Sequence, residues 1–195
     1  MQQILRALQE RVQALGKPGL EAIRQLPKDE RRERYGFANF EGLAKWRKGA
    51  RLFGPLQQAA KQLGCTIRVG KPYNTMAAAD CDTATRDILI RRFKGRRAFQ
   101  AYALAHELAH CVLQHGVGEP PPVVGWQTER YLGEIEAETV AHLVCAQLGL
   151  DTLEVASRYV LNFQFKLADE VVWSPEREAR ILAAAETIHR VVRNR

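Results

Sequence analysis

Two histidines stand four residues apart in the segment Ala105-His106-Glu107-Leu108-Ala109-His110. On a helix such a pair projects from one face, about one turn apart, so both imidazoles can bind one metal ion. Glu107 follows the first histidine and stays beside that ion, where it can accept a proton from a water molecule. The H-E-x-x-H pattern therefore predicts a metal centre with His106 and His110 as ligands and Glu107 as general base.

Residues 97–115 around this motif are expected to form a helix that is apolar on almost every side and therefore buried. Burying two histidines and a glutamate costs several kcal/mol unless another group compensates, and a bound cation does so. We therefore favour a metal centre over the alternative, a metal-free core in which hydrogen bonds satisfy the histidines.

A catalytic zinc ion usually has three protein ligands and one position for water, so the motif lacks one ligand. His115 is a poor candidate, because a helix that continues through residue 115 turns it about 140° away from His110. The third ligand therefore has to come from another segment of the chain.

The predicted helix over residues 127–148 offers three acids at alternating positions. Glu134 and Glu138 share a face of small and apolar residues, which we expect to pack against the metal-binding helix. Glu136 points roughly 160° away from the midpoint of the other two, toward solvent or a rim. We expect Glu134 to be the third ligand and Glu138, one turn on, to accept the free ring N–H of a ligand histidine. Glu136 is the alternative ligand.

The rest of the sequence predicts an α+β fold, in which a small three-stranded sheet precedes a helical half. Strands are expected at residues 65–69, 76–81 and 86–91. Residues 116–125 contain three consecutive prolines and are expected to form a loop. Further helices are expected over residues 1–15, 20–26 and 55–63, from Asp151 with Glu154 in a capping box, and from Ser174-Pro175, with Ile181, Ala185, Ile188 and Val192 facing the core.

Two parts of the chain are distinguished by composition. Residues 1–49 are predicted to be a basic helical N-terminal extension, and residues 50–195 the main domain. Residues 28–48 mix basic and aromatic side chains, which either stack on nucleic-acid bases or dock this segment onto the main domain. We favour docking, because no nucleic-acid-binding signature is present.

Overall composition is that of a globular protein: 195 residues, 46% hydrophobic and 26% charged. The longest uncharged apolar run, residues 139–150, is shorter than the ~20 residues that cross a bilayer, so no membrane association is expected. Charged residues interrupt the first hydrophobic segment, which excludes a secretory signal there. The four cysteines form no C-x-x-C pair. We expect a cytoplasmic protein with its cysteines reduced and buried as small apolar side chains.

Net charge is +7 and unevenly distributed. Residues 1–115 hold 21 Lys and Arg against 10 Asp and Glu, whereas residues 116–195 hold 8 against 12. This basic front, residues 1–115, indicates either a side that faces an acidic partner or a nucleic acid, or a charged surface that keeps the protein in solution.

The motif and its surroundings resemble a known family. H-E-L-A-H after a strand ending Ile88-Leu89-Ile90, with E-x-E-A-E-x-x-A about 24 residues later, is similar to the ImmA/IrrE-type zinc metallopeptidases and to the related metallopeptidase domain of ArdC-type antirestriction proteins. The resemblance covers roughly residues 55–192, and its specific part is residues 88–150. Members of the ImmA/IrrE family commonly have Asn where this chain has Glu138.

This resemblance implies a minimal zincin-like fold, with Zn²⁺ bound by His106, His110 and Glu134 and with Glu107 as general base. It also implies cytoplasmic, regulatory proteolysis, often of a DNA-bound repressor or in mobile-element defence. In zincin-like folds the substrate lies extended along an edge strand, which we assign here to residues 86–91.

The sequence thus predicts a zinc-dependent metallo-endopeptidase that acts on a protein or peptide, with arginines near the end of strand 86–91 favouring acidic or nucleic-acid-associated substrates. The alternative is a DNA-binding or antirestriction-type protein that uses a zincin scaffold without proteolysis. The intact Glu107 argues against this alternative, because a purely structural metal site does not need a carboxylate there. Tyr159 is expected to be a packing residue rather than an oxyanion donor.

Overall fold

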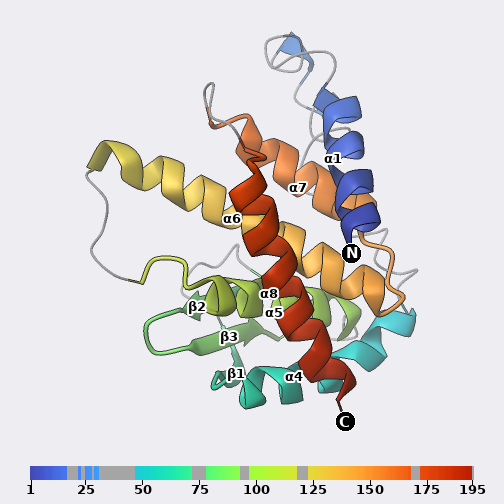
Figure 1. Cartoon of the computed structure of the whole chain (residues 1–195), viewed down its shortest axis with the longest axis vertical. Coiled ribbons are helices and arrows are strands. Elements are labelled where there is room, and N and C mark those ends of the chain that lie inside the picture. Colours follow the sequence, from blue (N-terminus) through green and yellow to red (C-terminus); the bar gives the residue numbers. More distant parts are fainter. Residues whose placement is uncertain are drawn as a thin grey trace.

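The computed structural model describes residues 1–16, 22, 25–27, 29–30, 47–71, 78–92, 97–117, 123–167 and 172–194. This part of the chain confirms the predicted α+β class, with six α-helices, one 3₁₀ helix and a three-stranded mixed sheet (Figure 1). Most of the predicted helix at residues 20–26, most of the basic and aromatic segment 28–48 and the three prolines lie outside the described residues. In chain order the elements are α1 (Gln2–Gly16), η2 (Arg47–Leu52), α4 (Phe53–Gln62), β1 (Thr66–Gly70), β2 (Ala79–Asp82), β3 (Asp87–Arg91), α5 (Arg97–Leu113), α6 (Val123–Gln147), α7 (Leu153–Gln164) and α8 (Pro175–Arg193).

The sheet has the strand order β1-β3-β2, with β1 parallel and β2 antiparallel to β3. β3 is therefore the central strand, and Ile88 and Ile90 on it are fully buried. The assignment of residues 86–91 to an edge strand was wrong, because both hydrogen-bonding sides of β3 are already paired. Alternating burial identifies a half-buried strand but does not show which strands flank it.

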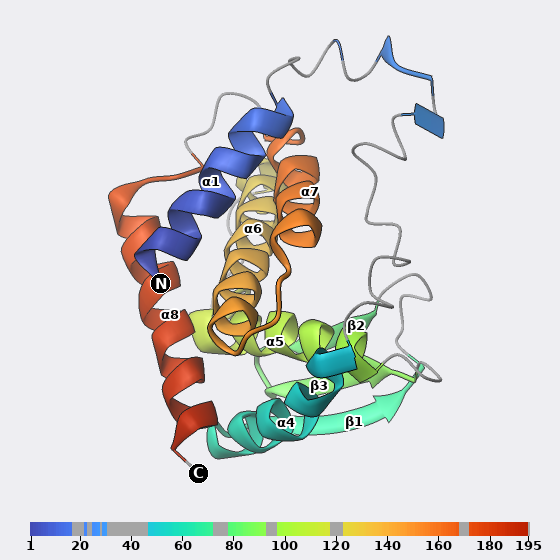
Figure 2. The same ribbon diagram turned by 90° about the vertical axis from the view of Figure 1, so that its right-hand side faces the viewer.

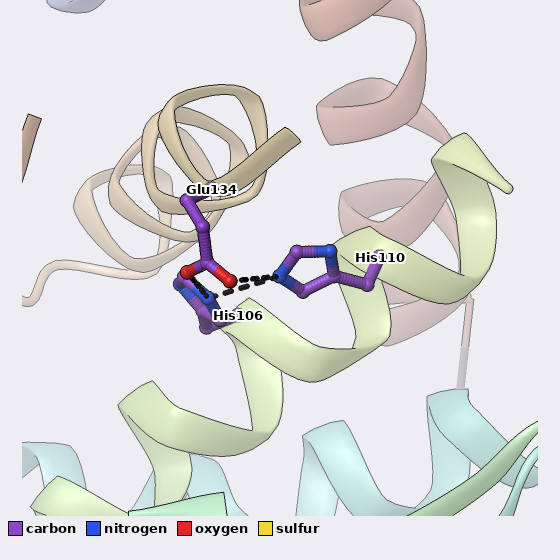
Figure 3. A group of neighbouring side chains, drawn as sticks. All are labelled: His106, His110 and Glu134. Atoms are coloured by element: carbon purple, nitrogen blue, oxygen red, sulfur yellow. Dashed lines mark hydrogen bonds and ion pairs between the residues drawn. The ribbon is translucent and has the colours of Figure 1, made fainter. Parts of the chain in front are cut away.

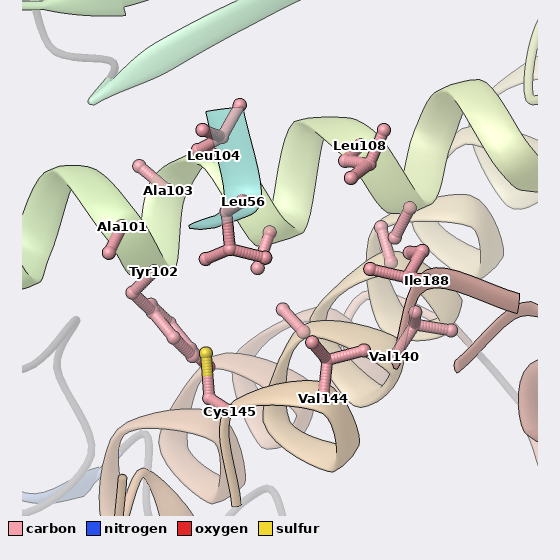
Figure 4. Close-up of a cluster of buried hydrophobic side chains, with 14 of the residues drawn as sticks. Leu56, Ala101, Tyr102, Ala103, Leu104, Leu108, Val140, Val144, Cys145 and Ile188 are labelled. Carbon is pink, nitrogen blue, oxygen red and sulfur yellow. The ribbon is translucent and has the colours of Figure 1, made fainter. Parts of the chain in front are cut away.

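Helix α5 lies between the sheet and the other long helices (Figures 1 and 2). It contacts β2 and β3 on one side and α6 on the other, and it also contacts α4 and α8. Leu104 and Leu108 of α5 are fully buried, as the apolar sequence of this helix predicts. Figure 4 shows these leucines and Ala101 in a core shared with Val140 and Val144 of α6. The segment of α5 that contains the H-E-x-x-H motif is thus held by packing from several directions.

Helix α6 begins earlier than its sequence predicts, at Val123 rather than at residue 127. The prediction of a loop over residues 116–125 was therefore wrong for residues 123–125. A proline directly before the first turn of a helix removes no helical hydrogen bond, so prolines up to residue 122 are compatible with this start.

Helices α1, α7 and α8 complete the packing around α6. Leu8 and Val12 of α1 are buried with Val160 of α7 in a second apolar cluster, so residues 1–16 belong to the packed core. Ser174 caps α8 by accepting a hydrogen bond from the backbone N–H of Arg177, as predicted. The four residues predicted to form the core face of α8, Ile181, Ala185, Ile188 and Val192, are all buried. The capping box expected before α7 is formed only in part: Asp151 accepts a 3.1 Å hydrogen bond from the backbone N–H of Leu153, whereas Glu154 pairs with Arg11 and Arg158.

No helix in the described ranges combines the length and apolar character needed to cross a membrane.

His142 of α6 is a buried core residue outside the metal-binding cluster. Only 2% of its surface is exposed, and its Nδ1 lies 2.7 Å from Oγ1 of Thr152. Burial lowers the pKa of His142 to about 4. The folded protein therefore keeps this imidazole neutral at pH values where the unfolded chain protonates it.

We expect His142 to make unfolding pH-dependent. The pKa of His142 is about 4 in the folded protein and about 6.5 in the unfolded chain. The free energy of unfolding is therefore unaffected by this group above pH 6.5 and decreases by roughly 3 kcal/mol as the pH falls toward 4, because the unfolded chain binds the proton first. His142→Gln should flatten this part of the curve in denaturant unfolding measured from pH 7.5 to 4. His189→Gln should flatten it less, because His189 is less buried, although burial and the charge of Arg193 also lower its pKa. Identical pH dependence in wild type and His142→Gln would contradict the assignment.

Candidate metal centre

His106 and His110 lie one turn apart in α5 and direct their Nε2 atoms to the same point (Figure 3). These two atoms are 3.1 Å apart. Glu134 reaches the same point from α6, with Oε2 3.5 Å from His106 Nε2 and Oε1 4.0 Å from His110 Nε2. One ligand atom from each residue lies within 4.8 Å of the others. The three residues are therefore close enough to hold a metal ion.

The donor set fits Zn²⁺ in both chemistry and spacing. Two imidazole nitrogens and one carboxylate oxygen are common zinc ligands, and ligands about 2.0–2.2 Å from a tetrahedral ion lie roughly 3.3–3.6 Å apart. The observed separations of 3.1 to 4.0 Å span this range. Among the described residues this is the one group of three or more His, Cys, Asp or Glu side chains with such spacing.

Glu138 and Tyr102 hold His106 in place. Oε2 of Glu138 lies 2.8 Å from His106 Nδ1, which is the contact expected from the spacing of the two acids on α6. The other oxygen, Oε1, accepts a hydrogen bond of 2.5 Å from the hydroxyl of Tyr102. A carboxylate on Nδ1 orients the ring and leaves the Nε2 lone pair facing the metal position. Tyr102 stands four residues before His106, so helical spacing alone places it on the same face.

His115 supports His110 in the corresponding way. Its Nδ1 lies 2.8 Å from Nδ1 of His110, the ring nitrogen that faces away from the metal position. The prediction that His115 lies on the far side of the helix was wrong, because α5 ends at Leu113 and the chain turns at Gln114. Gln114 has a φ of 58°, in the left-handed region, and this turn brings His115 back beside His110.

Glu136 lies on the side of α6 away from Glu134, as the helical angles predict, but it is buried rather than exposed. Only 3% of its surface is accessible, and Oε2 lies 2.8 Å from His115 Nε2. Arg177 and Arg180 of α8 reach the same carboxylate at 3.3 and 3.5 Å. The expectation of a solvent-facing or rim position was wrong, because α8 covers this side of α6. Glu136 is not part of the metal-binding cluster.

The electrostatics of the cluster suit a cation. Burial lowers the pKa of His106, but its hydrogen bonds with Glu134 and Glu138 outweigh this effect and raise the pKa well above the usual value. Burial and the charge of His106 lower the pKa of His110 to about 3, so His110 offers a free lone pair at neutral pH. Burial opposes ionisation of Glu134, but the hydrogen bond from His106 and nearby charges lower its pKa to about 2. These shifts favour a positive charge, either a proton or a metal ion, between the three side chains.

Glu107 is partly buried and differs from the other acids in its protonation. Burial raises the pKa of Glu107 to about 7. The negative charges of Glu134 and Asp80 raise this pKa further, whereas the positive charge of His106 lowers it. A carboxylate with a pKa near the working pH can both accept and return a proton. This is the property required of the residue that follows the first histidine of the motif.

Tyr159 of α7 contacts the cluster from a third helix. Its hydroxyl donates a 2.5 Å hydrogen bond to Oε2 of Glu134, and its ring meets the His106 ring edge-on, with centroids 5.4 Å apart. The expected packing role is present, and the bond to Glu134 was not foreseen. Similarly, only the tertiary structure could reveal the contribution of Arg177 and Arg180, which lie some 40 residues further along the chain than Glu136.

Comparison with protein-family models, with curated proteins and with solved structures gives no match to this chain. The function therefore has to be inferred from the residues of the site.

We expect Glu134→Gln to weaken Zn²⁺ binding by roughly 100-fold or more, because a carboxylate that contacts both histidines is lost. Zinc titration of metal-free protein against a chromophoric chelator measures this affinity. Glu129→Gln, an exposed acid on the same helix, is the matched control and should bind like wild type. Unchanged affinity in Glu134→Gln would exclude this residue as a ligand.

His115→Ala should lower Zn²⁺ affinity about 10- to 100-fold without removing a ligand, because His110 loses the partner of its Nδ1 atom. The same chelator competition measures the change, and circular dichroism checks that the variant is folded. His189→Ala, on α8, should retain the affinity of wild type. Equal affinities in the two variants would show that His115 does not position His110.

Proposed function

We propose that this protein is a zinc-dependent metallo-endopeptidase. The observation that carries the proposal is the convergence of His106, His110 and Glu134 from two packed helices. Glu107 follows His106 directly in α5, and the charges of His106 and Glu134 act on its carboxyl group. Three protein ligands leave one coordination position for water, which is typical of catalytic zinc sites, whereas structural sites are closed by four ligands. The resemblance to ImmA/IrrE-type metallopeptidases supports the same reaction class.

The zinc ion, when bound, supplies Lewis-acid polarisation of a carbonyl group and lowers the pKa of a water molecule. Glu107 accepts the proton that this water loses as it attacks the peptide carbonyl carbon. The carboxylic acid then returns the proton to the amine nitrogen as the C–N bond breaks. The raised pKa of Glu107, about 7, suits both transfers.

The contacts behind the ligands favour this role over a metal-free core. Glu138 and His115 each engage the Nδ1 atom of one ligand histidine, so both Nε2 atoms remain directed at the metal position. Tyr159 restrains Glu134 in the same way. A core that merely buried two histidines would not require all three groups to face one point.

The substrate is a protein or peptide that binds in extended form along β2. This strand is at the edge of the sheet and, unlike the central β3, leaves one side of its backbone unpaired within the described residues. β2 also contacts α5, and the charge of Asp80 on it acts on Glu107. Addition of a substrate strand there would bring a peptide bond toward the cluster.

A DNA-associated protein is the substrate class that the resemblance and the basic front together favour. A regulatory peptidase of this kind would act in the cytoplasm. The alternative of a DNA-binding protein without proteolysis lacks an observation of its own, because most of residues 28–48 lie outside the described residues.

Glu107→Gln should keep Zn²⁺ bound and lower the cleavage rate by about 10²–10⁴-fold, because the amide cannot accept the proton of the attacking water. Mapping of new protein N-termini in cells that produce wild type or the variant reveals the substrate, which is then assayed with purified protein. Glu186→Gln, an exposed acid on α8, serves as the matched control. Cleavage that persists in Glu107→Gln would refute the role of Glu107.

Zinc analysis of the same samples separates the rival functions. Stoichiometric zinc without any wild-type-specific N-terminus would favour a binding protein that uses the zinc site structurally. Absence of zinc from the wild type, even after incubation with the ion, would favour the metal-free core.

A further inference from the structure

Three of the four cysteines meet beneath α5, on the side that faces the sheet. Cys111 follows the metal-binding motif directly, and its Sγ lies 3.0 Å from Sγ of Cys81 on β2. Cys65, directly before β1, supplies a third thiol that is hydrogen-bonded with Cys111. The fourth, Cys145, lies on α6 close to Glu138. All four are free thiols in the structure.

The guanidinium of Arg86 lies beside this group of thiols. Arg86 has a φ of 59°, in the left-handed region, and its Nη2 donates a 2.8 Å hydrogen bond to the carbonyl oxygen of Leu63. Its Nε is buried without a hydrogen-bond partner, and its positive charge acts on Cys65 and Cys111.

The three cysteines differ in solvent accessibility, and this difference determines which thiol an oxidant reaches first. Cys81 is partly exposed and can be reached by a small oxidant, whereas Cys65 and Cys111 are buried. A hydrogen bond with Cys111 and burial raise the pKa of Cys65 well above its usual value, so Cys65 remains a thiol at neutral pH. Cys81 is therefore the thiol to be oxidised first, and Cys111 is the nearest thiol to react with the product.

We propose that Cys81 and Cys111 are a site of reversible oxidation, which closes a disulfide when hydrogen peroxide is the oxidant. Cys81 attacks the peroxide, its thiol becomes a sulfenic acid, and one water is released. The Cys111 sulfur then attacks the sulfenic sulfur, the S–S bond forms and a second water leaves. Two thiols thus lose two electrons and two protons to one peroxide, and a dithiol reductant reverses the reaction.

The geometry makes this bond accessible with little rearrangement. A disulfide has an S–S distance of about 2.05 Å, so the two sulfur atoms need to approach by about 1 Å. The crosslink would join the edge strand β2 to helix α5, one residue after His110. Its formation does not depend on the proposed peptidase activity, so the two proposals can fail separately.

Peptide mapping of the reduced protein treated with one equivalent of hydrogen peroxide tests the proposal. The sequence places Cys65, Cys81 and Cys111 in separate tryptic peptides, residues 62–68, 69–86 and 98–130. We expect peptides 69–86 and 98–130 to be linked, two of the four thiols to be lost to a thiol reagent, and the protein mass to fall by two hydrogens. Dithiothreitol should restore all four thiols.

Serine variants identify the partners. Cys81→Ser should abolish the crosslink, whereas Cys65→Ser and the matched control Cys145→Ser should form it like wild type. Thermal unfolding of each reduced variant verifies that it is folded. The proposal is overturned if all four thiols survive peroxide, if oxidation stops at a sulfenic or sulfinic acid on Cys81, or if the linked peptides contain Cys65 in place of Cys81.

Discussion

The packing of α5 against α6 is the constraint on which the site depends, because it brings Glu134 to the Nε2 atoms of His106 and His110. Neither helix carries a complete ligand set. Small and apolar residues between the helices allow the close approach, and fully buried Leu104 and Val140 lie in the shared core (Figure 4). Any displacement of one helix by an ångström changes the separation of the donor atoms, so the rigidity of the core determines whether one ion can be bound.

Each of the three candidate ligands has its own supporting group, and these groups come from different parts of the chain. Glu138 holds His106, His115 holds His110, and Tyr159 of α7 holds Glu134. Burying so many polar groups is unfavourable unless they are paired, and here the pairing continues outward to Arg177 of α8. The polar network therefore connects the metal position to helices that provide no ligand, which gives α7 and α8 a function beyond covering the core.

The sheet contributes on the other side of α5. Its central strand β3 is paired on both sides, whereas the edge strand β2 has one unpaired side among the described residues and carries Cys81, whose Sγ contacts Cys111. One short strand thus lies next to the proposed substrate position and next to the helix that carries the histidines. Oxidation of this contact would fix β2 to α5 at the point where their relative position matters for binding.

Local periodicity was sufficient to predict the helix with His106 and His110, the three strands within a few residues, and the shared face of Glu134 and Glu138. These features depend on spacing along one element, which the order of residues determines by itself. Contacts between distant segments decided the rest: β3 became central, α8 buried Glu136 beneath Arg177, and a left-handed turn at Gln114 returned His115 to His110. Strand order, coverage by a later helix and the exact end of a helix depend on tertiary packing energies, which the pattern of one segment does not contain.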